Sequence, residues 1–553
     1  MTNKRPSATN NCSRQGVVFL TALCLLIVYL VQPAFSQRKK TQKVKDDRVY
    51  LLHADELRHD QFGANPDAQI VKGHVSFLHQ GANLTCDSAY FYQETNSVKA
   101  FGNVFFKQGD TLSLKCVYAD YDGESQIMKA RKNVVLKHRK QTLYTDSLDY
   151  DRLYKNAYFF EGGKLVDGKE QLVSDWGEYS TESREAVFYY NVVLKGENRR
   201  VTTDTLHYDT RQSIAHVLGP SKIEQGESII NTEDAFFNTQ SDQAQLYGRS
   251  TIIDGQKTII GDSVFYDKVT GQCEGYGNVI FIDQENKNSL IGDYLNYNEL
   301  TGFGFATKNA LVKEFSQRDT LYMHADSIKI YTYNIETDSV YRVIHAFNKA
   351  RAFRTDVQAV SDSLVFNTLD TCLTMYKDPV LWNGPRQLLG EVIKVYMNDS
   401  TVREAHVLGQ ALSIEQTHKP EYHNQISSRD MFAYFVDGAV REAVSVGNVK
   451  IIYFTVDDKD SSFIGMNYTE TDTMKMYISE ERKLERIWMP KQRGVLYPMT
   501  QIPAGKSRLP EFAWLDRLRP VSPEDVFVWR GKEESEKLKV VERHAPPTQK
   551  LSE

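Results

Sequence analysis

Aspartate is the residue whose repetition first suggests chemistry in this chain. A phrase of the form Asp-(Ser/Thr)-apolar-x-apolar recurs at Asp146, Asp204, Asp262, Asp326 and Asp362, usually ending in an aromatic residue. Recurring carboxylates could act as general acids or as metal ligands. An aspartate that returns at the start of every strand pair is more simply explained as a turn residue whose side chain satisfies nearby backbone donors. We therefore expect no catalytic or metal-binding role for these carboxylates.

Histidine and the common catalytic motifs give no stronger signal for an enzyme. Thirteen histidines are spread through the chain, and the pair His418 and His423 lacks a third ligand or a nearby cysteine. The sequence contains no Gly-x-Ser-x-Gly, Walker loop, zinc-protease helix or Cys-His constellation. An analogy with β-solenoid polysaccharide lyases and hydrolases would require charged residues grouped on one sheet face. The inward positions that can be assigned are apolar, so we expect no enzyme, no cofactor and no metal.

The four cysteines outside the N-terminal segment are too scattered for a dense disulfide framework. They are Cys86, Cys116, Cys273 and Cys372. Buried thiols are the expected state. Cys86 and Cys116 lie one repeat apart, so a disulfide between these two residues is left open.

Residues 1–36 are predicted to be a signal peptide, which also removes Cys12 and Cys24. A basic start is followed by an apolar run over residues 17–31, then by small residues at Ala34 and Ser36. An uncleaved anchor and a lipoprotein signal at Cys24 are the alternatives. Cleavage removes three of the 67 Lys and Arg and none of the 72 Asp and Glu. The exported chain would then be acidic, which argues against nucleic acid as a partner.

The aspartate phrases belong to an internal repeat. Looser copies begin at Asp55, Asp87, Asp175, Asp234, Asp293, Glu391 and Asp430, and successive copies are mostly 28 to 39 residues apart. A second phrase follows about fifteen residues later, as in Gly102-Asn103-Val104-Phe105-Phe106 and in the copies at Gly277 and Gly447. The aligned Asn is expected in a turn or in the left-handed region. Both phrases alternate apolar side chains with period two, which predicts strands.

Turn signals such as Asp122-Gly123, Asn231-Thr232 and Asp254-Gly255 are expected to separate these strands. Some thirteen or fourteen two-strand units would then stack into one elongated all-β structure over residues 37–480. Two architectures fit: a two-sheet β-jellyroll with an apolar interior, and a parallel β-solenoid. The irregular repeat length favours the jellyroll.

The chain changes character near residue 480. Eight of its fifteen prolines follow, together with aromatic residues such as Trp514 and Trp529. Because proline cannot donate to a strand ladder, we expect the sheet to stop there. Residues 481–531 are predicted to form an extended strap that packs on the last units or binds a partner, and residues 532–553 a disordered tail.

The paired phrases resemble the OstA/LptA family of organic solvent tolerance and lipopolysaccharide-transport proteins, whose β-jellyroll also forms the N-terminal domain of the outer-membrane partner LptD. The resemblance is strongest over residues 50–312 and degenerate over 313–480. It implies a V-shaped jellyroll in the periplasm, in part associated with the outer membrane, that carries the acyl chains of lipopolysaccharide or a similar amphipathic lipid in an apolar groove. The repeat array is longer than in the usual bridge protein, and no run of lipid-facing strands follows it.

A groove of this kind would be lined by the inward positions of both phrases. They are Val104, Phe106, Leu206, Tyr208, Val264, Tyr266, Val279, Phe281, Leu364 and Phe366. A closed core made of the same side chains is the alternative. A second alternative is an envelope scaffold or glycan-binding repeat protein, which would display aromatic residues on its outer faces.

The ends of the array are the expected docking sites for partners. A strand near residues 49–52 would present an unpaired edge to an envelope transport protein or to another copy, end to end. The strap would cap the opposite end or bind a second partner.

Overall fold

A computed structural model describes residues 47–540, apart from 242, 317, 336, 399, 400, 458 and 482. The predicted signal peptide, with Cys12 and Cys24, lies outside these residues, and so does the tail beyond residue 540. Among the described residues no helix has the length and hydropathy needed to cross a membrane.

The described residues form one 36-stranded sheet. Its first strands are β1 (Tyr50–His53), β2 (Glu56–His59), β3 (Gln69–His79), β4 (Ala82–Tyr92), β5 (Ser97–Gln108), β6 (Leu112–Asp122), β7 (Ile127–His138), β8 (Gln141–Asp151), β9 (Asn156–Phe159), β10 (Gly163–Asp167), β11 (Glu170–Ser174) and β12 (Trp176–Ser180). The middle strands are β13 (Glu185–Lys195), β14 (Arg199–Asp209), β15 (Ile214–Gln225), β16 (Ser228–Asn238), β17 (Gln243–Asp254), β18 (Lys257–Asp267), β19 (Gln272–Asp283), β20 (Asn288–Asn298), β21 (Phe303–Thr307), β22 (Leu311–Glu314), β23 (Leu321–His324) and β24 (Ser327–Tyr333). The last are β25 (Tyr341–Phe353), β26 (Val357–Asn367), β27 (Cys372–Tyr376), β28 (Val380–Asn383), β29 (Arg386–Leu389), β30 (Val392–Met397), β31 (Val402–Gln416), β32 (His423–Val436), β33 (Ala439–Val456), β34 (Phe463–Ile478), β35 (Leu484–Trp488) and β36 (Arg493–Pro498).

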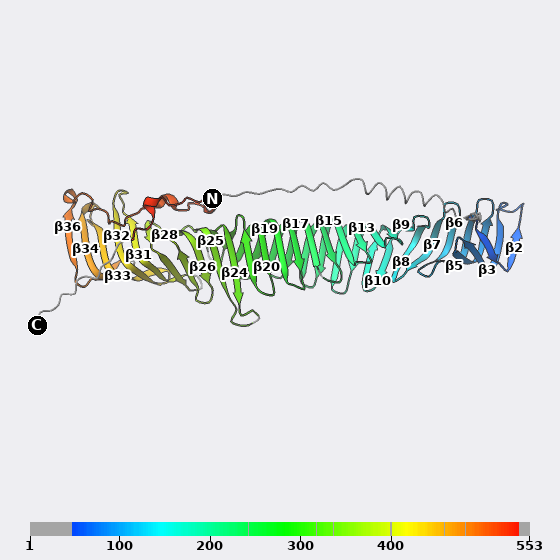
Figure 1. Cartoon of the computed structure of the whole chain (residues 1–553), viewed down its shortest axis with the longest axis horizontal. Coiled ribbons are helices and arrows are strands. Elements are labelled where there is room, and N and C mark those ends of the chain that lie inside the picture. Colours follow the sequence, from blue (N-terminus) through cyan, green and yellow to red (C-terminus); the bar gives the residue numbers. More distant parts are fainter. Residues whose placement is uncertain are drawn as a thin grey trace, which may run out of the picture. The chain divides into compact units, whose positions relative to one another are not determined.

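The strands follow one another in chain order, and each long strand pairs antiparallel with its neighbours (Figure 1). The all-β prediction is therefore confirmed. The parallel β-solenoid alternative is wrong, because the pairings are antiparallel from the first strands to the last.

Each long strand bends in the middle, and this bend is where the two sequence phrases meet. In β5 the pairing register slips between Phe101 and Val104, where Gly102 and Asn103 have φ angles of 72° and 44°. The Asn103 side-chain amide donates a hydrogen bond of 2.9 Å to the carboxylate of Asp87 on β4. The left-handed Asn is thus confirmed, and the repeated Asp fixes a mid-strand bend rather than a turn between strands.

The bend divides every unit between two limbs. We call the limb that contains the Asp phrases, such as residues 147–151, the first limb, and the limb that contains residues 104–108 and their partners the second limb. The same geometry corrects one predicted turn: Asn231-Thr232 lies inside β16, where the register slips, whereas Asp122 and Asp254 do end strands.

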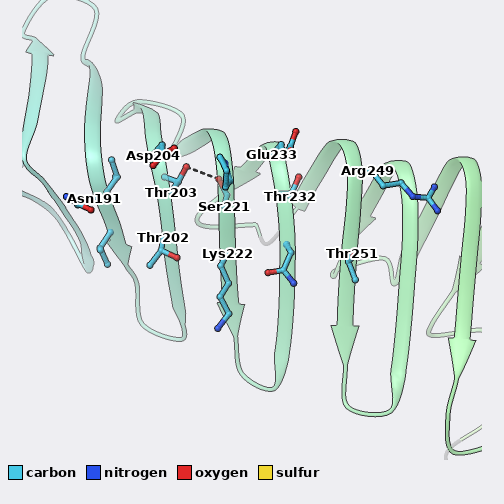
Figure 2. A pocket seen from close by; sticks show the side chains of 14 residues that line it. Asn191, Thr202, Thr203, Asp204, Ser221, Lys222, Thr232, Glu233, Arg249 and Thr251 are labelled. Atoms are coloured by element: carbon cyan, nitrogen blue, oxygen red, sulfur yellow. Dashed lines mark hydrogen bonds between the residues drawn. The ribbon is translucent and has the colours of Figure 1, made fainter.

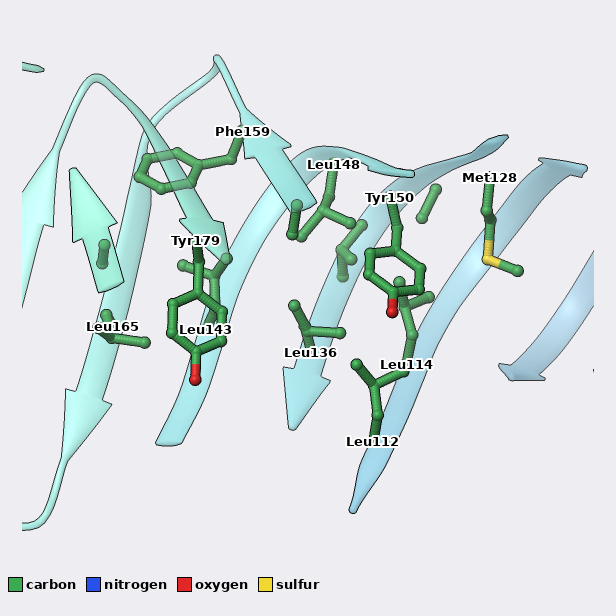
Figure 3. Packing of buried hydrophobic residues seen from close by; sticks show 14 of the residues in the cluster. Leu112, Leu114, Met128, Leu136, Leu143, Leu148, Tyr150, Phe159, Leu165 and Tyr179 are labelled. Atoms are coloured by element: carbon green, nitrogen blue, oxygen red, sulfur yellow. The ribbon is translucent and has the colours of Figure 1, made fainter. Parts of the chain in front are cut away.

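Apolar side chains from both limbs fill the space between them. Leu114, Leu136 and Leu143 of the second limb face Tyr150 and Tyr179 of the first (Figure 3). One continuous buried cluster extends from Val49 to Cys273. Strict alternation along each strand sends every second side chain into this cluster, which is the period-two pattern of the sequence.

The sheet continues beyond residue 480, contrary to the prediction. β35 and β36 pair with the two halves of β34 and form one last bent strand. Pro490 lies in the bend between them and Pro498 ends β36, so neither proline removes a ladder hydrogen bond.

Residues 499–540 then run back along the outer face of the second limb (Figure 1, red). This segment contains η1 (Met499–Gln501), η2 (Asp516–Leu518), η3 (Glu524–Phe527) and η4 (Glu534–Glu536). We call it the strap. The backbone N–H groups of Leu509 and Leu515 each donate a 2.8 Å hydrogen bond to a buried glutamine, Gln425 on β32 and Gln387 on β29.

Beneath the strap, the outward positions of the second limb are apolar. Trp382, Ile414 and Phe454 pack there against Leu515 and Leu518. Residues 532–540 also pack, contrary to the predicted disordered tail: the Lys532 ammonium lies 2.8 Å from the carboxylate of Asp378. The strap therefore covers the side of the last units, and β36 remains the outermost strand.

The four described cysteines are free and buried. Cys86 and Cys116 are the bend residues of β4 and β6, with β5 between them, so they are two strand spacings apart, about 9.6 Å. That distance is too long for a disulfide without backbone movement. Burial raises the pKa of Cys86 to about 11 and the pKa of Cys116 and Cys273 to about 12.

The geometry of the bend predicts that one methyl group added at Gly102 destabilises the fold. In Gly102→Ala the new Cβ would lie 2.4 Å from Asp87 Oδ2, at a positive φ. We expect a loss of about 2 kcal/mol in the free energy of unfolding, measured with urea. Gly109→Ala is the matched control, because it also has a positive φ but meets no atom within 4 Å. Equal losses in the two variants would contradict the role of Asp87.

The buried thiols predict that the folded protein becomes less stable at alkaline pH. Unfolded cysteine ionises near its ordinary pKa of 9.0, whereas folded Cys116 and Cys273 stay protonated to about pH 12. The unfolded chain then binds fewer protons, so stability falls as the pH rises from 9 toward 12, by roughly 1.4 kcal/mol per pH unit for each such thiol. Urea unfolding at pH 8 and 10 measures this slope, which Cys116→Ala should reduce. An unchanged slope in that variant would refute the assignment.

Candidate functional site

Tyrosines close the space between the limbs in the first half of the sheet. The Tyr121 hydroxyl on the first limb lies 2.6 Å from His79 Nδ1 at the end of the second limb, and Arg152 Nη1 donates to the same hydroxyl at 2.5 Å. All three side chains are buried. They join the two limbs at the open side of the V, opposite the bends.

Equivalent contacts between the two limbs follow in the next three repeats along the sheet. The Tyr150 hydroxyl donates to Gln108, Tyr179 contacts His138 Nδ1 at 2.8 Å, and the Tyr208 hydroxyl donates to Asp167. We call these four contacts the cross-limb latches. Each pairs a tyrosine of the first limb with a residue 41 or 42 positions earlier.

The latches lie in a water-poor environment. Burial raises the pKa of Tyr121 and Tyr150, and raises the pKa of Tyr179 and Tyr208 to about 12. Burial likewise lowers the pKa of His138. Burial therefore favours the neutral form of the four latch tyrosines and of His138.

The run of latch tyrosines is interrupted at Phe237, which has no hydroxyl. From β16 onward many of the inward side chains near the strand ends are only partly buried, although Cys273 and Leu290 remain buried. The partly buried side chains include Ile230, Ile252, Ile259, Tyr297, Val312, Leu321, Ile330, Ile344, Leu373, Leu381 and Leu388. Residues nearer the bends, such as Val264 and Ala350, remain buried. The interior thus changes from a shut core to an apolar inner face that is partly exposed.

The ten predicted lining residues all lie at inward-facing strand positions. They divide between the shut part and the partly exposed part of the interior. Seven are buried: Val104, Phe106, Leu206, Tyr208, Val264, Val279 and Leu364. Three are partly buried: Tyr266, Phe281 and Phe366. The first four belong to the shut half, so only the last three reach an exposed part of the inner face. Sequence reasoning missed the latches, although the 29-residue spacing of Tyr121, Tyr150, Tyr179 and Tyr208 was a usable signal.

A second feature is a polar cavity of about 670 Å³ at the bends of β13 to β17 (Figure 2). Figure 2 shows Asp204, Glu233 and Arg249 at the bend, with Thr202, Lys222 and Thr251 further along the second limb. Thr203, Ser221 and Thr232 line it with hydroxyl groups at positions where other strands carry valine or cysteine. No cavity residue had been predicted, because the hydroxyl residues do not form a recognisable motif.

The histidine pair faces aromatic rings. His418 stacks on Phe463 at 4.5 Å, and buried His423 lies 5.0 Å from the Trp514 ring of the strap. Within the described part of the chain, no three His, Cys, Asp or Glu residues are grouped so that they could hold a metal ion.

A long sheet bent around an apolar interior, latched in one half and partly exposed in the other, defines an extended β-jellyroll. Residues 46–204 match the model of the OstA-like protein family, which confirms the resemblance carried by the repeated phrases. OstA-like proteins are a transport and binding family whose members are typically periplasmic. A search among curated proteins finds no significant match.

The latches predict a specific cost of removing one hydroxyl. In Tyr121→Phe the buried Arg152 and His79 groups lose a shared partner, so we expect a loss of about 1 to 3 kcal/mol in unfolding free energy. Hydrogen exchange should also rise at the ends of β3 and β6. Tyr144→Phe is the control, since Tyr144 is 45% exposed. Similar behaviour of the two variants would show that Tyr121 does not hold the limbs together.

Proposed function

We propose that this chain is a non-enzymatic envelope protein that binds the acyl chains of an amphipathic lipid between its two limbs, in lipopolysaccharide transport or outer-membrane assembly. The observation that carries the proposal is the partly exposed apolar inner face from β16 onward. The match to the OstA-like family supports a lipid as the ligand.

The proposal assigns different roles to the two halves of the sheet. Tyr266, Phe281 and Phe366 would contact the acyl chains, with Val264, Val279 and Leu364 as the floor of the groove. Val104, Phe106, Leu206 and Tyr208 would stabilise the latched half as a rigid extension. Burial of roughly 0.8 kcal/mol per CH₂ group is enough to hold a multi-chain lipid while its sugars stay in water.

Partners would join at the two ends of the sheet. β1 and β2 form one outer edge, where Tyr50, Leu52 and Leu57 are exposed. β35 and β36 form the other, where Trp488 and Leu496 are exposed. In the described part of the chain these strands pair on one side only, and such an edge can add to the edge of another sheet, so envelope transport proteins or further copies of this chain fit there. We place the protein in the periplasm on the strength of its family.

Substitutions in the groove should weaken lipid binding without unfolding the protein, whereas a substitution in the core should lower the stability of the fold. Phe281→Asp and Phe366→Asp place a charge on the partly exposed face, so we expect the fold to survive and capture of lipopolysaccharide to fall at least tenfold. Phe106→Asp buries an unpaired carboxylate and should lower the unfolding free energy by several kcal/mol. The measurements are binding of purified lipopolysaccharide in a displacement assay with a fluorescent fatty acid, and urea unfolding.

Phe105→Asp is the matched control, because Phe105 neighbours Phe106 but points to the outer face beside Lys115. It should keep both the fold and lipid capture. Lipid capture that is unchanged in Phe281→Asp and Phe366→Asp would refute the groove.

A further inference from the structure

The polar cavity at the bends of β13 to β17 contains hydrogen-bonding groups that the protein itself does not use. The side chains of Thr202, Asp204, Asn231, Glu233 and Thr251 line it. None of these five side chains has a hydrogen bond or ion pair to another residue in the described part of the chain. They offer hydroxyl, amide and carboxylate groups to a ligand with many donors and acceptors.

The charges of the cavity argue against a phosphate or another anion as that ligand. Its two cations are already engaged: Lys222 pairs with Glu224, and Arg249 Nη1 donates to Asp262 at 2.9 Å. Asp204 and Glu233 leave the unengaged part of the lining acidic. A polyhydroxylated ligand without strong negative charge fits this lining better than an anion does.

Aromatic rings lie on the first limb beyond these bends, although none of them lines the cavity itself. A row on the outer face passes from His207 through His216, Phe236 and Tyr247 to Phe265, with each ring 3.7 to 6.1 Å from the next. β14, β16 and β17 each carry one of these rings within three residues of a cavity residue. Phe236 is 37% exposed. Sugar rings combine hydroxyl edges with an apolar C–H face, so rings beside unpaired polar groups match both parts of a saccharide.

The regular spacing of the strands favours a linear polymer as the ligand. Neighbouring strands place equivalent side chains about 4.8 Å apart along the axis. The ring row and the cavity therefore present rings and polar groups at regular intervals, which matches the regular spacing of a chain of sugar units.

We propose that the bends of β13 to β17, together with the adjoining row of aromatic rings, form a binding site for a linear oligosaccharide. This site lies on the outer surface, and its occupation does not depend on acyl chains between the limbs. The saccharide could come from the polar part of a glycolipid or from a free polysaccharide, which share the required chemistry.

Calorimetry with the full chain tests the site against two lipid-free probes. One is the oligosaccharide released from lipopolysaccharide by mild acid, and the other is a hexamer of β-1,4-linked N-acetylglucosamine. We expect saturable binding of at least one probe, weakened about tenfold by Asn231→Ala and by Phe236→Ala. The probe that binds identifies the source of the sugar.

Two controls keep the test independent of folding. Glu161→Gln changes an exposed acid at the bend between β9 and β10, and Phe101→Ala shortens an outer-face ring row that borders no part of the cavity. Both should bind the probe like the unaltered chain. No saturable binding of either probe, or equal weakening in the controls, would overturn the proposal. Because neither probe contains acyl chains, failure here leaves the lipid-binding proposal to its own test.

Discussion

The structure depends on the bend in the middle of each strand. At this bend a left-handed Gly-Asn pair faces an aspartate on the neighbouring strand, as Gly102 and Asn103 face Asp87. One strand of eleven or twelve residues can then contribute to both limbs and bury an apolar face on each. Without the bend, the same alternation would give a flat sheet with one apolar face exposed to water. The repeated aspartate is therefore an architectural residue.

Much of this arrangement follows from local patterns in the sequence. Period two places Val104 and Phe106 inside, and the recurring Asp and Gly-Asn phrases locate nearly every bend. Other features depend on residues far apart in the chain. Tyr121 and His79 meet only after the limbs fold together, and the outward-pointing Trp382 is buried because the distant strap covers it. Composition alone also misread residues 481–498, since Pro490 and Pro498 occupy a bend and a strand end.

Because the interior is closed in one half and partly exposed in the other, one fold presents two kinds of inner surface. Hydroxyl, imidazole and guanidinium groups close the limbs from β3 to β14, whereas beyond Phe237 apolar side chains at the strand ends stay partly exposed. Few sequence changes are needed to pass from one kind of interior to the other, because the interior near the bends stays apolar throughout. The outer surface varies independently, from the polar cavity at β13 to β17 to the strap-covered face of the last strands.

The strap changes how the last third of the sheet must come apart. Elsewhere each strand contacts mainly its sequence neighbours, so units can fray one by one from an end, as in other linear repeat proteins. Hydrogen bonds between Leu515 and Gln387 and between Arg519 and Gln358 join residues 128 and 161 positions apart. They fasten strands from β26 to β32 to one continuous segment. We therefore expect this third to unfold as a single cooperative block, and unravelling under tension or heat to start from the N-terminal strands.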